Sequence, residues 1–189
     1  SFVEFLDASI SIPGLGVITY DLAFGGAYYA IVKGENVGLN IESSNIGDFI
    51  DIGMKIKNSI VQNIKIEHPI MPEMNFLYGT IFTFDPIDNN NHSRNVCVFA
   101  NGEVDRSPTG TGVSARAAIH YARNEIKLRE MLTIESIIGS TFSVSVVEES
   151  NIGSLDAVIP EVVGSANIVG RSTFWIDSND DIALGFMLR

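Results

Sequence analysis

The sequence predicts an α+β domain in which a mostly antiparallel, curved sheet dominates and two helices pack on it or inside it. Three observations lead to this prediction. Apolar and polar residues alternate in about eight short segments, which is the period of a half-buried strand. Only two segments have the period of a helix. No strand–helix–strand unit repeats along the 189 residues, as it would in a parallel fold.

The first of these elements is a hairpin followed by a strand, within residues 10–34. Pro13-Gly14 is typical of a turn, and the residues from Val17 to Leu22 alternate after it. The segment AYYAIVKG continues as a strand because it is rich in β-branched and aromatic residues.

The spacing of apolar residues then changes from that of a strand to that of a helix in ESSNIGDFIDIGMKIKNSIVQNI, where isoleucines recur at helical spacing. Ser43 or Ser44 is the expected N-cap of this first helix. Two further strands are expected at LYGTIFTF and NVCVFANG, with the polar loop DPIDNNNHS between them.

The second helix is expected from about Val113 to Glu130, after the glycine-rich turn DRSPTGTG. The period returns to two in four later segments, which are TIESII, FSVSVVEE, DAVIPEVVGSANIVG and STFWIDS. We expect strands in all four.

The turn itself has the composition of an anion site. Gly110 and Gly112 leave the backbone free of side chains, and Thr109 or Thr111 can cap the helix that follows. A helix start offers unpaired N–H groups and a partial positive charge. The turn therefore fits a carboxylate or a phosphate, although the pattern is also that of a well-capped helix with no ligand.

Two common phosphate motifs are excluded here. No lysine follows the glycines as in a P-loop, and Ala115 stands where the dinucleotide fingerprint has its third glycine. Asp105 and Arg106 precede the turn, either as a solvated pair or with Asp105 capping the turn. In the alternative interpretation, Asp105 binds an ammonium beside the anion cradle, which would suit the two charges of an amino acid.

Charge and cysteine usage limit the partners. The formal net charge is −11, which argues against nucleic acid and anionic membranes. Cys97 is the single cysteine, so no internal disulfide is possible and a cytoplasmic protein is expected. No signal peptide is visible, and the apolar run Val17–Val32 is too short and too polar to span a bilayer.

Taken together, these motifs resemble the proline racemase family, which includes hydroxyproline epimerases and trans-3-hydroxy-L-proline dehydratases. DRSPTGTG resembles the family's second active-site motif. The likeness extends over nearly the whole chain, through DLAFGGAYYAIV, HPIMPEMNFLYGTIF, GSANIVGRSTFWID and GFMLR.

The resemblance implies two similar domains of the diaminopimelate epimerase type, each a barrel around a central helix, with the active site between them. Residues 1–170 would form the second domain, and residues 171–189 would form strands that return to the first. The family's Cys-Gly-His motif does not occur in this chain. Cys97 lies in the strand pattern VCVFA and is expected to be an inert core thiol. A homodimer is the oligomeric state that the family suggests.

The resemblance also implies roles for the turn. Racemases and epimerases of the family place a second cysteine at position 109, whereas threonine there is typical of the dehydratases. Asp105 would bind the ring nitrogen of the substrate, and the N–H groups of Gly110, Thr111 and Gly112 would hold its carboxylate. No cofactor or metal is implied. His68, His92 and His120 are scattered without ligand spacing, and His68 is expected to be structural.

The expected function is therefore dehydration of trans-3-hydroxy-L-proline, with Thr109 orienting the departing hydroxyl. A thiol can ionise near neutral pH, but the hydroxyl of threonine cannot. Position 109 would therefore lack the second base that inversion needs. Two alternatives are a proline racemase or hydroxyproline epimerase with an altered base, and a non-catalytic amino-acid-binding domain.

Overall fold

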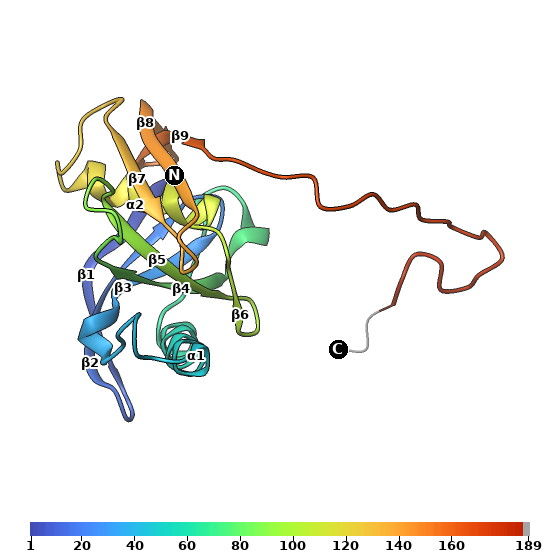
Figure 1. Cartoon of the computed structure of the whole chain (residues 1–189), viewed down its shortest axis with the longest axis horizontal. Helices are drawn as coiled ribbons and strands as arrows, with labels where there is room; N and C mark the ends of the chain where they lie inside the picture. Colours follow the sequence, from blue (N-terminus) through green and yellow to red (C-terminus); the bar gives the residue numbers. More distant parts are fainter. Residues whose placement is uncertain (187–189) are drawn as a thin grey trace.

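The computed structural model describes residues 1–186 of the chain, as nine strands, two α-helices and two short 3-10 helices (Figure 1). The strands are β1 (Phe2–Ile12), β2 (Gly16–Phe24), β3 (Tyr28–Lys33), β4 (Leu77–Phe84), β5 (Ser93–Phe99), β6 (Glu103–Val104), β7 (Met131–Glu135), β8 (Thr141–Ile152) and β9 (Leu155–Val163). The helices are η1 (Gly34–Val37), α1 (Ile46–Asn63), η2 (Pro72–Met74) and α2 (Gly110–Ala122).

The sheet closes on itself as a barrel. Its strand order is β4-β3-β2-β1-β9-β8-β7-β5, and β5 pairs with β4 to complete the ring, while the short β6 adds to β5 outside it. Only the β3–β4 and β5–β7 pairs are parallel. The predicted α+β class and mostly antiparallel barrel are therefore confirmed, and closure removes the unpaired edges that an open sheet would expose.

Helix α2 is the central element of this barrel. Its eight residues from Gly112 to Ile119 are all buried, and the helix contacts β1, β2, β3, β8 and β9. One side packs Val113 and Ala117 among the apolar residues of β7–β9, and another packs Ala115 and Ile119 against those of β3–β5. A helix that is buried all round must carry small or apolar residues on almost every face, which explains the run GVSARAAI apart from its arginine, Arg116.

The glycine pair between β2 and β3 lets α2 approach the sheet closely. A Cβ on Gly25 would lie 2.1 Å from the carbonyl oxygen of Thr111 and 2.3 Å from the amide nitrogen of Ala115. One on Gly26 would lie 2.8 Å from the Thr111 methyl group, on a backbone with φ of +110°. Both positions require glycine, so this pair seats the start of α2.

Helix α1 lies outside the barrel and packs on β4 and β5 through the face formed by Phe49, Gly53, Ile56 and Ile60. Its N-cap is Asn45, not Ser43 or Ser44. The Asn45 side chain accepts a hydrogen bond from the Asp48 amide, and the Asp48 carboxylate accepts one from the Asn45 amide. This reciprocal capping box outcompetes a single serine cap.

Other boundaries also differ from the prediction. Strand β1 begins at Phe2, eight residues before the predicted hairpin, because its bulged, half-exposed residues do not alternate cleanly. Helix α2 starts at Gly110 rather than near Val113, and it ends at Ala122 rather than near Glu130. Asn124 adopts a left-handed φ of 57°, which ends the helix.

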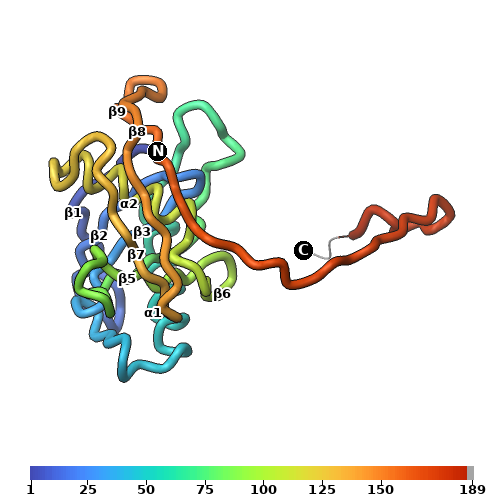
Figure 2. Tube along the Cα trace, turned by 45° about the horizontal axis from the view of Figure 1, so that its top comes forward, coloured from blue at the N-terminus to red at the C-terminus, as the bar shows by residue number. Residues whose placement is uncertain are grey.

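The end of the described chain, residues 164–186, contains no strand and extends away from the barrel (Figures 1 and 2). The strand predicted at STFWIDS is therefore not formed here, because an extended segment needs a neighbouring strand for its backbone hydrogen bonds. The last three residues of the GFMLR motif lie outside the described residues. No helix in the described part of the chain is long and apolar enough to cross a membrane.

Candidate active site at the start of helix α2

The DRSPTGTG turn connects β6 to the start of α2, and its backbone is strained at one residue. Thr109 precedes the first helical residue with φ of 73° and ψ of 101°. Positive φ is rare for a β-branched residue and costs about 1–3 kcal/mol. Thr109 is also buried. Strain of this kind persists where the surroundings hold the backbone in place.

Asp105 holds the turn through both of its carboxylate oxygens. Oδ1 accepts from the Ser107 amide at 2.8 Å, and Oδ2 accepts from the Thr109 hydroxyl at 3.0 Å. The turn-capping role considered for Asp105 is thus present in the structure. Thr109 occupies the N-cap position, but neither its hydroxyl nor that of Thr111 caps α2. The expectation of a threonine cap was wrong because each hydroxyl has another partner.

The first N–H groups of α2 are left without partners. The first bond of the helix runs from the Val113 amide to the Thr109 carbonyl at 2.8 Å. Among the described hydrogen bonds, none uses the amides of Gly110, Thr111 or Gly112, as expected for the first turn of a helix. These three N–H groups and the helix dipole create a site suited to a carboxylate.

The two glycines of the turn have different roles. A Cβ on Gly110 would meet nothing within 4 Å, so the backbone there faces open space. A Cβ on Gly112 would lie 2.5 Å from Ile81 Cδ1 and 3.1 Å from Thr109 Cβ. Gly112 is therefore required for packing inside the barrel, whereas Gly110 keeps the approach to the helix start free.

An aromatic cluster borders this helix start, and the sequence prediction did not assign it to the site. The hydroxyl groups of Tyr29 and Thr111 are 2.8 Å apart and share a hydrogen bond. The ring of Tyr29 packs against Tyr78, which in turn packs against Phe99. Burial raises the pKa of Tyr29, so its phenol stays protonated and can position Thr111. The aromatic content of AYYAIV and FLYGTIF was the signal that could have found them.

Cys97 lies directly behind the turn, in β5. Its side chain is 1% exposed, and its carbonyl accepts from the Asp105 amide at 3.1 Å. Burial, with a smaller contribution from the Asp105 charge, raises the pKa of the thiol to about 12. The thiol is therefore neutral at pH 7, in agreement with the prediction of an inert core cysteine.

His68 has a structural environment, as expected. Its Nδ1 accepts from the amides of Ile70 and Met71, and its ring packs against those of Phe2 and Phe24. His92 and His120 are not scattered, however. Their rings are 4.7 Å apart, because His92 directly precedes β5 and His120 lies in the last turn of α2. The described part of the chain contains no cluster of three or more His, Cys, Asp or Glu side chains that could hold a metal ion.

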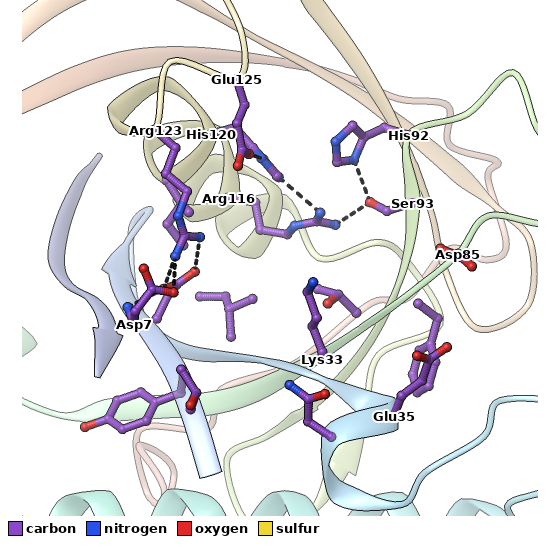
Figure 3. Close-up of a pocket in the computed structure, with 18 residues that line it drawn as sticks. Asp7, Lys33, Glu35, Asp85, His92, Ser93, Arg116, His120, Arg123 and Glu125 are labelled. Carbon is purple, nitrogen blue, oxygen red and sulfur yellow. Dashed lines mark hydrogen bonds and ion pairs between the residues drawn. The ribbon is translucent and has the colours of Figure 1, made fainter. Parts of the chain in front are cut away.

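This histidine pair lines a cavity of about 750 Å³ at the other end of α2 from the turn (Figure 3). None of the predicted site residues lines it. On one side of the cavity Arg123 bridges Asp7 and Asp21, with N–O distances of 2.6 Å. On the other side the Arg116 guanidinium points at His120 and Ser93.

His120 is neutral in this network. Arg116 can only donate, so the 3.1 Å contact to Nε2 requires an unprotonated nitrogen there. The contact between Nδ1 and Glu125 at 2.5 Å is then a hydrogen bond from a neutral ring. Burial and the nearby Arg116 charge lower the pKa of His120 to about 4.

We expect the chain to lose stability as the pH falls from about 6.5 to about 4. In this window the unfolded chain protonates His120 and the folded chain does not, so acid favours unfolding by about 1–2 kcal/mol at pH 5. Urea unfolding at pH 7 and pH 5 measures this. His120→Gln, which cannot ionise, should flatten the dependence, and an unchanged slope in that variant would contradict the assignment.

The structure is therefore a closed α+β barrel around a central helix, and the first N–H groups of that helix are free to bind an anion. Comparison with known proteins gives its family. The family model described as proline racemase matches residues 1–187, and the chain belongs to the proline racemase family.

Three relatives illustrate the range of activities. A trans-3-hydroxy-L-proline dehydratase of Colwellia psychrerythraea is 45% identical over all of this chain and 53% of its own length. A 3-hydroxyproline 2-epimerase of Burkholderia multivorans is 39% identical over all of this chain and 56% of its length. The crystal structure of a hydroxyproline epimerase from Agrobacterium vitis, with bound trans-4-hydroxy-L-proline, superposes with a TM-score of 0.86 at 36% identity. It matches 99% of this chain and 53% of its own. The chain spans about half the length of these relatives.

Proposed function

We propose that this chain supplies one wall of the active site of a cofactor-independent trans-3-hydroxy-L-proline dehydratase. The single observation that carries the proposal is the identity of the N-cap residue of α2, which is a threonine. Thr109 carries a hydroxyl, bonded to Asp105, at the position where the family resemblance implies that racemases and epimerases have their second base. The 45% identity with a relative named as this dehydratase supports the same choice.

In the proposed complex, the substrate carboxylate lies against the N–H groups of Gly110, Thr111 and Gly112. These donors stabilise the negative charge that grows on the carboxylate as the α-proton leaves. The Asp105 carboxylate binds the charged ring nitrogen. The aromatic cluster of Tyr29, Tyr78 and Phe99 borders the ring.

The reaction is an elimination. A cysteine thiolate from an N-terminal half, of the Cys-Gly-His kind that the family resemblance implies, takes the α-proton. The electron pair of the C–H bond becomes the double bond between C2 and C3, and the C3–O bond breaks. The departing hydroxide takes up a proton from the solvent and leaves as water, the thiol returns its proton to the solvent, and a pyrroline-2-carboxylate remains. Thr109 orients the departing hydroxyl.

A second candidate is a hydroxyproline epimerase, favoured by the 39% identity with the relative of that name and by the Agrobacterium vitis structure. In this chain, Cys97 cannot be its second base, because burial raises the pKa of that thiol to about 12. Another group would have to deliver the proton to the far face.

We also propose that residues 1–170 form one of two similar domains of the diaminopimelate epimerase type and that the described part of the remaining segment, residues 171–186, packs on the other. Phe174 and Trp175 are 88% and 91% exposed in this chain. Large apolar side chains on an extended segment need a partner surface, and an N-terminal half would provide it. A cytoplasmic homodimer is the assembly we propose.

The test compares this chain alone with a full-length protein in which an N-terminal half, of the kind that the family resemblance implies, precedes it. We expect the full-length protein to convert trans-3-hydroxy-L-proline to a pyrroline-2-carboxylate without added cofactor, and the 189-residue chain alone to be inactive. Turnover by the chain alone that Cys97→Ser abolishes would show that Cys97 is a base after all.

A further inference from the structure

A buried polar bridge connects the interior of α2 to the DRSPTGTG turn. Asn95, in β5, is 1% exposed, and both ends of its amide are bonded. Its oxygen accepts from Arg116 Nη1 at 2.8 Å, and its nitrogen donates to the Pro108 carbonyl at 3.0 Å. Pro108 is the residue before the strained Thr109, so the bridge ends at the peptide that leads into the site.

Arg116 fixes which way the Asn95 amide points. A guanidinium has five donors and no acceptor, so the amide oxygen must face Arg116 and the amide nitrogen must face Pro108. Arg116 is itself 4% exposed and is held by Ser93 at 2.7 Å and His120 at 3.1 Å (Figure 3). Its described partners are all neutral, and burial lowers its pKa to about 10, so the charge is retained at pH 7.

Such a buried charge is costly unless it is fully hydrogen-bonded. An apolar side chain would fit the interior of the barrel at a lower cost in desolvation. The arginine therefore requires an explanation beyond packing, and the orientation of Asn95 provides one.

The bond to Pro108 acts on the peptide that enters Thr109. Fixing the Pro108 carbonyl fixes the plane of the Pro108–Thr109 peptide, and φ of Thr109 is the rotation that follows it. That φ is +73°, a value which the surroundings must hold in place. The same rotation sets where the Thr109 hydroxyl and the free N–H of Gly110 point.

We propose that Arg116 and Asn95 are positioning residues, which hold the turn so that Thr109 and the first N–H groups of α2 meet the substrate. The proposal rests on the proposed function of the turn. Arg116 sets the amide of Asn95, and Asn95 sets the peptide between Pro108 and Thr109.

Asn95→Asp in the full-length protein tests this bridge. A carboxylate of almost the same shape still accepts from Arg116, so the buried charge keeps a partner and the barrel should fold. It cannot donate to Pro108. We expect kcat for trans-3-hydroxy-L-proline to fall roughly ten- to hundredfold, with a smaller change in KM, because the turn acts most strongly in the transition state.

Thr80→Val is the matched control. The Thr80 hydroxyl is fully buried and donates to the Gly53 carbonyl at 3.0 Å, far along the chain from the turn. Its loss should lower stability while leaving kcat at the wild-type level. An equal fall in kcat for the two variants would show that Asn95 is merely structural and would overturn the proposal.

Hydrogen exchange of the full-length protein separates this proposal from the proposed function. Asn95→Asp and Arg116→Met should both speed deuterium uptake in the peptide 105–113, whereas Thr80→Val should not. Failure of the unmodified protein to dehydrate trans-3-hydroxy-L-proline would reject the proposed function alone. Unchanged uptake in the turn, in either variant, would overturn the positioning role.

Discussion

Gly110→Val in the full-length protein is expected to lower the rate of dehydration on the order of a hundredfold or more. The valine side chain would occupy the open space that we assign to the substrate carboxylate and would displace it from the N–H groups of α2. Loss of one such donor from a transition state has a cost of this size. The measurement is kcat/KM for trans-3-hydroxy-L-proline.

A side chain at Gly110 can block the helix start without disturbing the packing of the domain. An added Cβ meets nothing within 4 Å, and φ is not in the left-handed region, so the domain itself should tolerate the change. Gly112 would not serve, because its Cβ would collide with Ile81. Ala122→Val, on the exposed last turn of the same helix, is the control and should retain activity. Normal turnover in Gly110→Val would mean that the turn only starts the helix.

Thr109→Cys in the full-length protein is expected to give an activity that the unmodified protein lacks, the slow inversion of a proline without a 3-hydroxyl. Inversion requires a proton delivered to the face opposite the one from which it was removed, and a thiol at position 109 can ionise where an alcohol cannot. The change should also be tolerated, because cysteine is not β-branched and φ at this position is 73°.

Chiral separation of proline or 4-hydroxyproline after reaction in heavy water measures this inversion, beside the dehydration assay. Thr109→Ser is the matched control, since it keeps a hydroxyl and should not invert the substrate. The unmodified protein should at most exchange the α-hydrogen with retention. If the unmodified protein inverts proline at a rate matching its dehydration, the epimerase candidate replaces the dehydratase.

Local pattern was enough to predict much of the candidate site. The DRSPTGTG turn places Asp105, Thr109 and Gly110 within eight residues, so its chemistry depends on neighbours in the chain. The exclusion of Cys97 as a base also followed from strand alternation. The sequence pattern could not show that Gly112 is required for packing whereas Gly110 leaves the helix start open. The difference depends on Ile81, which lies close to Gly112 in space but about thirty residues away in the chain.

The amino-acid sequence on its own determined the α+β class, the two helices, most strands and the position of the turn, because hydrophobic period and turn residues are local properties. Barrel closure through β4 and β5 and the pairing of His92 with His120 arise only on folding. The Arg116–Asn95–Pro108 bridge belongs to this second group. It connects α2, β5 and the turn, and no spacing in the sequence indicates it. A buried donor and its acceptor become partners only when the closed barrel excludes water from both.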